Sequence, residues 1–448
     1  TTNSAITMRS IDGAAGTENL TFVAGSGVIT VNGDVTDIDV LTASSSGGAT
    51  FNGSVNATTV VITDLAADGN DVIFNDTLTA NTLAVNAGTV DYDVALNGGG
   101  QITTGGAATT FANTGTLQIG NSADDDMFIV SGFTALTGQS ALTFGGTIRT
   151  TNTAISIGDG DTDTTLAADT TFNAGNATLT INGDVAGAGN SLTLNTSGTT
   201  NITTNATMTG LSSLTVSSGV TQIRADITTT GDQTYNGNVT YFGDITLTGA
   251  NVQFVGTVTK DATTDTLAIA VGNLNLDGAA DVEALTVAEE ANFADDVTAV
   301  TSITVSDKTT IENNQTVTLA SGTGGISLEE VVGTTAGGND ETLILTAGGD
   351  GSGTTIAVTG AVSDLANLTI AQSGGATFGG AVTLSDTLTL TDTDNGDDII
   401  FNGFVTANTL VTQNPAYDLT FNAGGAIATN TDILSTGILT IGNDADDV

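Results

Sequence analysis

The chain has 448 residues, and its 49 acidic side chains face only five basic ones, which gives a formal net charge of −44. Cysteine and histidine are absent, which excludes disulfide frameworks, thiol or imidazole catalysis and zinc–thiolate sites. So few cations leave no basic surface for nucleic acid or anionic lipid, and no apolar run is long enough to insert into a membrane as a helix.

Short apolar runs recur along the whole chain, for example at residues 20–22, 60–62, 179–181, 343–345 and 388–390. They are rich in β-branched residues and threonine, and glycine, asparagine or aspartate closes each run after a few positions, which is the pattern of strands and turns. The most helix-like stretch, residues 281–296, still alternates like a pair of strands. The sequence therefore predicts an all-β protein.

A long internal repeat relates the two ends of the chain. Residues 47–55 match residues 374–382 at an offset of 327, and residues 114–121 match residues 436–443 at an offset of 322. A second copy of the repeat therefore starts near Thr335. We expect one continuous solenoid over residues 1–448 rather than two domains, and a chain that stops within a repeat resembles a segment of a longer structure.

A shorter period lies within the long one. Strand starts at Val239, Ile245, Val252 and Val258 are spaced by six or seven residues and together span 19. Three short strands in about 19 residues predict one triangular coil of a parallel β-helix, and coils of this length would form an elongated rod of about 23 coils. The alternative is an array of β-sandwiches, whose strands would be longer and more often interrupted by proline.

An aromatic residue followed by asparagine recurs at Phe51, Phe74, Phe172, Tyr235, Phe401 and Phe421. We expect the ring to fill the core, while the asparagine takes a tight, left-handed turn and forms a ladder with amides of neighbouring coils. The single proline, Pro415, cannot donate to a ladder and is expected outside the strands.

Residues 227–239, followed by residues 244–249, resemble the repeats of filamentous-haemagglutinin-like and autotransporter-passenger adhesins of bacteria. Modules of the form Ala-Thr-Phe-x-Gly-x-Val show the same similarity, which extends from about Leu20 to the end of the chain. The resemblance implies a right-handed parallel β-helix that is exported and serves as a stalk, fibre or adhesin at or beyond the cell surface.

An enzyme acting on polysaccharides is the main rival, because β-helices also carry lyases and glycoside hydrolases. A lyase needs a cationic group, but the cations are widely separated in sequence: Arg9, Arg149, Arg224, Lys260 and Lys308. Two carboxylates suffice for glycoside hydrolysis, yet tryptophan is absent and only four tyrosines could support a sugar ring. We therefore expect no enzymatic activity and assign no catalytic residue.

Acidic loops are the remaining candidate sites. Their alternating carboxylates have the spacing that hard cations favour, although none matches an EF-hand. The protein requires no cofactor in this interpretation, but calcium is a candidate ligand of Asp68, Asp71, Asp159, Asp161, Asp163, Asp392, Asp394 and Asp397. The alternative is that aspartate and glycine simply form soluble turns.

Neither end of the chain has the sequence of a cap, since residues 1–11 and 434–441 both resemble strands. Uncapped coils expose unpaired backbone groups, which further solenoid can cover, and head-to-tail contacts of this kind build fibres. We therefore expect a structural extracellular or cell-surface protein whose partners are copies of itself, in a filament, sheath or adhesin stalk. The alternative is an adhesin that binds a glycan or the cell envelope through its lateral face, with residues 331–342 and 348–354 as candidate loops.

Overall fold

The computed structural model describes residues 3–14, 17–44, 46–63, 70–103, 109–135, 138–160, 162–334, 340–348, 353–391, 393–394, 397–413, 415–429 and 431–442. The chain divides into two compact units, Thr1–Gly231 and Asp232–Val448. The described residues form strands and turns without any helix, so none of them belongs to a helix that could span a membrane. The predicted all-β class is confirmed.

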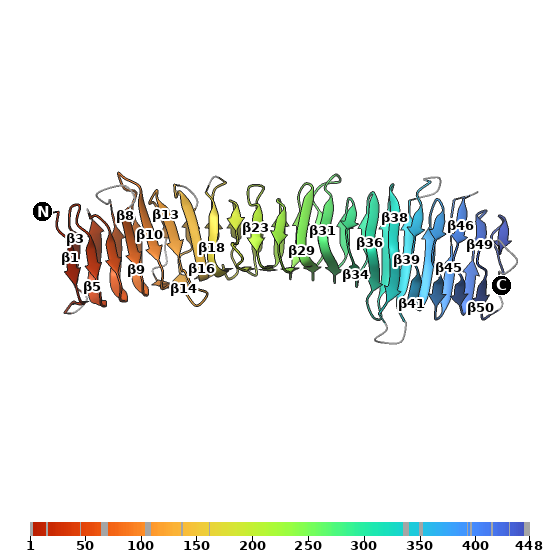
Figure 1. Cartoon of the computed structure of the whole chain (residues 1–448), viewed down its shortest axis with the longest axis horizontal. Coiled ribbons are helices and arrows are strands. Elements are labelled where there is room, and N and C mark those ends of the chain that lie inside the picture. Colours follow the sequence, from red (N-terminus) through yellow and green to blue (C-terminus); the bar gives the residue numbers. More distant parts are fainter. Residues whose placement is uncertain are drawn as a thin grey trace. The chain divides into compact units, whose positions relative to one another are not determined.

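The strands of the first unit follow one another at short intervals along the chain, and Figure 1 shows them side by side. They are β1 (Ile6–Met8), β2 (Ile11–Asp12), β3 (Glu18–Val23), β4 (Ile29–Val31), β5 (Val35–Ser44), β6 (Ala49–Phe51), β7 (Val55–Ile62), β8 (Asn70–Phe74), β9 (Leu78–Val85), β10 (Tyr92–Leu96), β11 (Gly100–Ile102), β12 (Thr109–Thr110), β13 (Thr116–Ile119), β14 (Asp126–Ile129), β15 (Phe133–Ala135), β16 (Ala141–Thr150), β17 (Ile155–Ile157), β18 (Thr164–Asn173), β19 (Leu179–Ile181), β20 (Val185–Ala186), β21 (Leu192–Asn195), β22 (Thr199–Ile202), β23 (Met208–Leu211), β24 (Leu214–Ser217), β25 (Val220–Ile223) and β26 (Ile227–Thr229).

The second unit continues the same pattern of short strands. They are β27 (Gln233–Tyr235), β28 (Asn238–Tyr241), β29 (Ile245–Phe254), β30 (Val258–Lys260), β31 (Leu267–Leu276), β32 (Ala280–Val282), β33 (Leu285–Val287), β34 (Ala291–Phe293), β35 (Val297–Ala299), β36 (Ser302–Ile311), β37 (Thr316–Ser321), β38 (Gly325–Gly333), β39 (Thr342–Ala347), β40 (Ile356–Val358), β41 (Val362–Leu365), β42 (Asn367–Gln372), β43 (Ala376–Phe378), β44 (Val382–Leu384), β45 (Thr387–Leu390), β46 (Asp398–Phe401), β47 (Val405–Ala407), β48 (Thr409–Thr412), β49 (Asp418–Phe421), β50 (Gly425–Ile427) and β51 (Leu439–Ile441). The helix-like stretch at residues 281–296 forms strands, as predicted.

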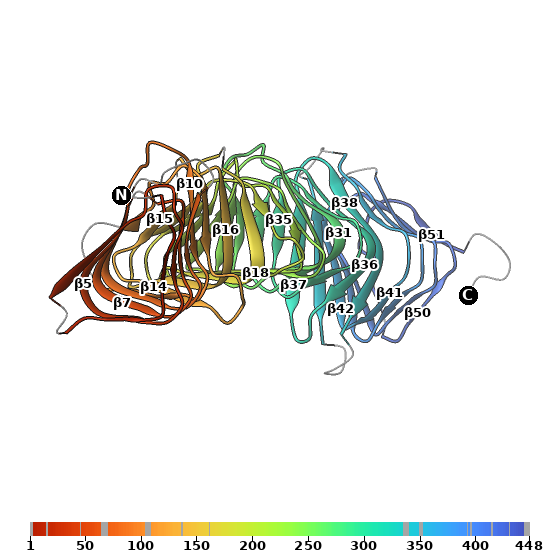
Figure 2. The same ribbon diagram turned by 60° about the vertical axis from the view of Figure 1, so that its left-hand side comes forward.

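Strands of successive coils pair in parallel, so each unit is a β-solenoid, and Figure 2 shows coils such as those of β5 and β7 lying over one another. The predicted parallel β-helix is thus confirmed, whereas its handedness stays a prediction. Coils are about 22 residues apart and make about 18 turns, so the predicted 19 residues and 23 coils are wrong as averages. Leu267 lies opposite Leu285, 18 positions on, but Ile326 lies opposite Ile356, 30 positions on. Only the strands must keep register, and the corners are free to vary in length.

The coil from which the 19-residue period was derived has the predicted length, since Val239 of β28 lies opposite Val258 of β30. The predicted strand starts at Ile245 and Val252, however, belong to one ten-residue strand, β29. The register of β29 against β31 shifts between Leu247 and Asn251, and this irregularity bends the strand. A bend inside a continuous strand therefore replaces one of the predicted turns.

Apolar side chains alternate with outward-facing polar ones, and the aromatic residues stack inside the core. Phe51 and Phe74 are buried, and their rings lie 4.9 Å apart at an interplanar angle of 7°. The second copy repeats this stack, since Phe378 and Phe401 lie 4.9 Å apart at 15°. The predicted role of the rings as core residues is confirmed.

The asparagines beside these rings form a ladder along the surface of the first unit. The amide nitrogen of each rung donates to the oxygen of the preceding one, from Asn52 to Asn32 at 3.1 Å, from Asn75 to Asn52 at 2.9 Å and from Asn97 to Asn75 at 3.0 Å. The predicted ladder is confirmed, but the left-handed turn is wrong, because none of these residues has a positive φ. Asn52, Asn75 and Asn97 each follow directly after the end of a strand (β6, β8 and β10), so their amides keep the register of the paired strands. Pro415 lies outside the strands, as expected.

We expect Phe74→Ala to weaken the first unit locally by about 3–5 kcal/mol, because it leaves a cavity in a closely packed stack. Hydrogen exchange of the amides in β6, β8 and β10 should accelerate by at least about 100-fold. Phe404→Ala is the matched control, since this ring is 41% exposed and its loss should leave exchange in these strands unchanged. Equal effects of the two variants would contradict the packing role of Phe74.

Candidate functional site

The acidic loop at residues 159–163 is described except for Asp161, which lies outside the described residues. Asp159 is exposed, and its Oδ1 accepts hydrogen bonds from the backbone nitrogen and the hydroxyl of Thr162, both at 3.1 Å. Asp163 is exposed at the start of β18. The carboxylate of Asp159 therefore closes a turn, the role that the alternative interpretation gave it.

The loop at residues 392–397 contains the most unusual of the predicted ligands. Asp392 lies outside the described residues, and Asp397 is half-buried. The backbone nitrogen of Asp397 donates to the carbonyl of Asp394 at 3.0 Å. Both carboxylate oxygens of Asp394 are buried without a hydrogen-bond partner among the described residues. No described residue therefore uses the capacity of the Asp394 carboxylate to accept hydrogen bonds or ligate a cation.

The third predicted group is reduced to Asp71, because Asp68 lies outside the described residues. Asp71 of β8 lies directly opposite Asp93 of β10, one coil further along. Partial burial raises the pKa of the Asp71 carboxyl group, and the charge of Asp93 and a hydrogen bond with its carboxyl group raise it further. A second coil pair repeats the arrangement, with Asp398 opposite Asp418.

Sequence reasoning missed these pairs, because 22 positions separate Asp71 from Asp93 and the predicted period of 19 placed them out of register. The actual spacing between neighbouring coils, 22 residues for Asp71 and Asp93 and 20 for Asp398 and Asp418, would have revealed both pairs. Among the described residues, no three acidic side chains lie close enough together to hold a metal ion. Three of the predicted ligands, Asp68, Asp161 and Asp392, lie outside the described residues, so calcium binding at the acidic loops stays a prediction.

The tyrosines that could have supported a sugar ring all lie in the core: Tyr92, Tyr235, Tyr241 and Tyr417. The hydroxyl of Tyr235 donates to Gln233 at 2.9 Å, and that of Tyr241 donates to the carbonyl of Asp265 at 3.1 Å. Burial raises the pKa of both hydroxyl groups. These rings stabilise the coils and offer no face to a carbohydrate.

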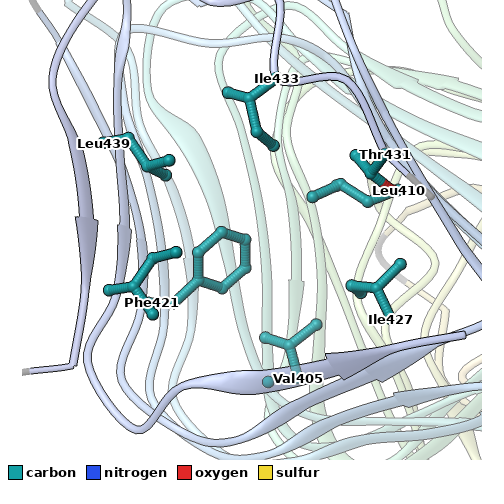
Figure 3. Close-up of a pocket in the computed structure, with 9 residues that line it drawn as sticks. Val405, Leu410, Phe421, Ile427, Thr431, Ile433 and Leu439 are labelled. Atoms are coloured by element: carbon teal, nitrogen blue, oxygen red, sulfur yellow. The ribbon is translucent and has the colours of Figure 1, made fainter. Parts of the chain in front are cut away.

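The last described coil carries an apolar hollow. Its lining residues include Val405, Leu410, Phe421, Ile427 and Leu439, and Figure 3 shows their side chains pointing into a common space. The strand at its rim, β51, pairs on one side with β49. On this face of the second unit, apolar side chains of the kind that fill the core elsewhere line a hollow that is open to solvent.

The first copy of the repeat shows how the same position looks when it is covered. Leu439 and Ile441 of β51 are 42% and 63% exposed, whereas the matching Leu117 and Ile119 of β13 are buried. There the next coil covers them, since β16 places Leu142 opposite Leu117 and Phe144 opposite Ile119. An apolar strand is thus the natural partner of β51.

Comparison with protein families, curated proteins and solved structures finds no significant match. The geometry alone defines the class, which is that of the parallel β-solenoid repeat proteins.

We expect Asp71→Asn to stabilise the first unit at pH 7 by no more than about 1 kcal/mol, because Asp71 is exposed and solvent screens its charge. The pKa of Asp71 is raised in the folded state, so its contribution to stability is present at low pH and lost as the pH rises. The gain should therefore vanish near about pH 3, where Asp71 is protonated. Thermal unfolding at both pH values measures it, and an equal gain at both would contradict the assignment.

Proposed function

We propose that the protein is a structural, non-enzymatic β-solenoid that forms or extends an extracellular filament, sheath or adhesin stalk. The observation that carries the proposal is the apolar face of β51, whose counterpart in the first copy is covered by another coil. The resemblance of residues 227–239 to haemagglutinin-like and autotransporter repeats supports export to the cell surface.

The partner of this face is the first coil of a second copy of the chain. β51, with Leu439, Thr440 and Ile441, has an apolar–polar–apolar pattern. β1 in the first coil, with Ile6, Thr7 and Met8, has the same pattern. Met8 is 39% exposed, so β1 also offers an apolar side chain without complete cover. Parallel addition of β1 to β51 continues the ladder and buries both sets of side chains. Repetition of this heterologous contact builds a fibre.

The acidic surface sets the conditions of assembly. Stacked coils place like charges in register, as in the pair of Asp398 and Asp418, so each added copy increases electrostatic repulsion. Salt or calcium reduces this repulsion. The buried carboxylate of Asp394 supports calcium as a ligand of the second unit.

Electron microscopy in calcium and after chelation should show fibres that shorten or disperse on chelation.

We expect Ile441→Asp to abolish end-to-end assembly, because it places a charge on the apolar face of β51, which loses its contact with water when a second copy binds. Sedimentation velocity should show assemblies of the wild-type chain that grow up to about 100 µM and only single chains of the variant. Val411→Asp is the matched control, since Val411 is 38% exposed in the same unit and does not line the hollow.

Two results would contradict the proposal. A wild-type chain that stays monomeric over this range in calcium would exclude assembly through its own ends. Loss of assembly in the Val411 variant as well would show that the lateral face, not β51, makes the contact. Protection of the chain from an external protease on intact source cells would contradict the extracellular location.

A further inference from the structure

The carboxylate of Glu341 is enclosed at a corner of the second unit. Glu341 lies immediately before β39, and its side chain is 0% exposed. The Oε1 atom accepts a hydrogen bond from the hydroxyl of Thr334 at 3.1 Å. The Oε2 atom, which is buried as well, accepts no hydrogen bond from the described residues. One of the two oxygens of a fully buried carboxylate therefore has no hydrogen-bond partner among the described residues.

No basic side chain compensates this group within the described part of the chain. The salt bridges there join Arg149 to Asp126, Lys260 to Asp281 and Lys308 to Glu290, and none includes Glu341. Burial of an ionised carboxylate without a counter-charge costs several kcal/mol, so such a group needs a cation or a proton. Since no basic side chain of the described residues forms an ion pair with Glu341, a counter-charge would have to come from solution.

The Oε2 atom of Glu341 and the carbonyl oxygen of Asp364 both lie beside Gly333, which has no Cβ atom. A Cβ atom on Gly333, the last residue of β38, would lie 3.0 Å from Oε2 and 2.1 Å from the carbonyl oxygen of Asp364. Asp364 of β41 has a positive φ of 57°, an uncommon conformation for aspartate, and its carbonyl therefore points at Gly333. A carboxylate oxygen and a carbonyl oxygen thus approach the same glycine.

The first unit builds the same arrangement from different residues. A Cβ atom on Gly13 would lie 3.1 Å from Oε2 of Glu18 and 2.1 Å from the carbonyl oxygen of Asp37. Asp37, like Asp364, has a positive φ, here of 55°. The first unit thus repeats the glycine and the aspartate of positive φ beside a glutamate. Glu18, however, is only half-buried, and its Oε2 accepts a hydrogen bond from the backbone nitrogen of Thr17 at 3.2 Å.

We propose that Glu341 is a ligand of a hard divalent cation of the calcium class, with the carbonyl oxygen of Asp364 as a second ligand. Carboxylate and carbonyl oxygens are the ligands that calcium prefers, and water completes its coordination shell. The affinity arises from the burial of an uncompensated charge rather than from a cluster of carboxylates. The site is distinct from the acidic loops and does not depend on the proposed function.

Thermal unfolding of the full chain in calcium and in chelator tests the proposal with two variants. Glu341→Gln keeps the shape and removes the charge, and Glu329→Gln removes an exposed charge from β38 of the same coil. We expect calcium to raise the unfolding midpoint of the wild type and of Glu329→Gln. In Glu341→Gln this rise should be smaller by at least about 2 °C. In chelator, Glu341→Gln should be more stable than the wild type, because a neutral amide is cheaper to bury.

An equal calcium-dependent rise in all three proteins would overturn the proposal, since the response would then come from other acidic groups. So would a shift of Glu341→Gln that is the same with and without calcium, which would show that a proton or bound water satisfies the carboxylate.

A second measurement needs no variant and applies even if Glu341→Gln does not fold. The carbonyl of Glu341 accepts hydrogen bonds from the backbone nitrogens of Ala366 and Asn367, at 2.9 and 3.1 Å. A cation held by Glu341 and Asp364 joins these two coils, so calcium should slow hydrogen exchange in a peptide covering Ala366 and Asn367. Magnesium at equal concentration should slow it less, because magnesium gives up its water reluctantly. Unchanged exchange in calcium would overturn the proposal.

Discussion

Parallel pairing of each coil with the next is the interaction on which the rest of this structure depends. It satisfies the backbone of strands that are often only three residues long and could not be stable alone. It also places equivalent side chains directly above one another, so that Phe51 meets Phe74 and Asn52 meets Asn75. Every coil therefore needs another coil as its cover. Leu439 and Ile441 in the last described strand are exposed where their counterparts Leu117 and Ile119 are covered, and this contrast is the basis of the assembly that we propose.

The same alignment that stabilises rings and amides concentrates negative charge. Stacked asparagines donate and accept in turn, whereas the stacked carboxyl groups of Asp71 and Asp93 repel one another once both are ionised. With 49 acidic and five basic residues, the chain cannot neutralise itself. Cations from solution are thus part of its physical chemistry, whether they screen the surface or enter a buried position such as that of Glu341.

Several features could be derived from particular residues. The alternation around Val239 and Val258 was sufficient for the solenoid, and the aromatic–asparagine pairs predicted both the core stack and the amide ladder. The predicted average coil length was wrong, because it was taken from a single coil whose corners are shorter than those of most other coils. That error concealed the register of Asp71 with Asp93. The predicted calcium ligands are neighbours in sequence. In the structure, however, Asp159 closes a turn, and the carboxylate oxygens of Asp394 are buried without a hydrogen-bond partner among the described residues.

The amino-acid sequence by itself determined the strand content, the parallel solenoid and the exclusion of cysteine and histidine chemistry, because periodicity and composition are local properties. Only the tertiary structure decided which carboxylates meet, since contacts between coils depend on the length of every intervening corner. It also decided the burial of Glu341, a residue that looks like any other acidic residue beside a glycine-rich loop. Its environment is made by Thr334, Gly333 and Asp364, and the last of these reaches it from the next coil. Such a site arises from the stacking of coils and has no signature within a single one.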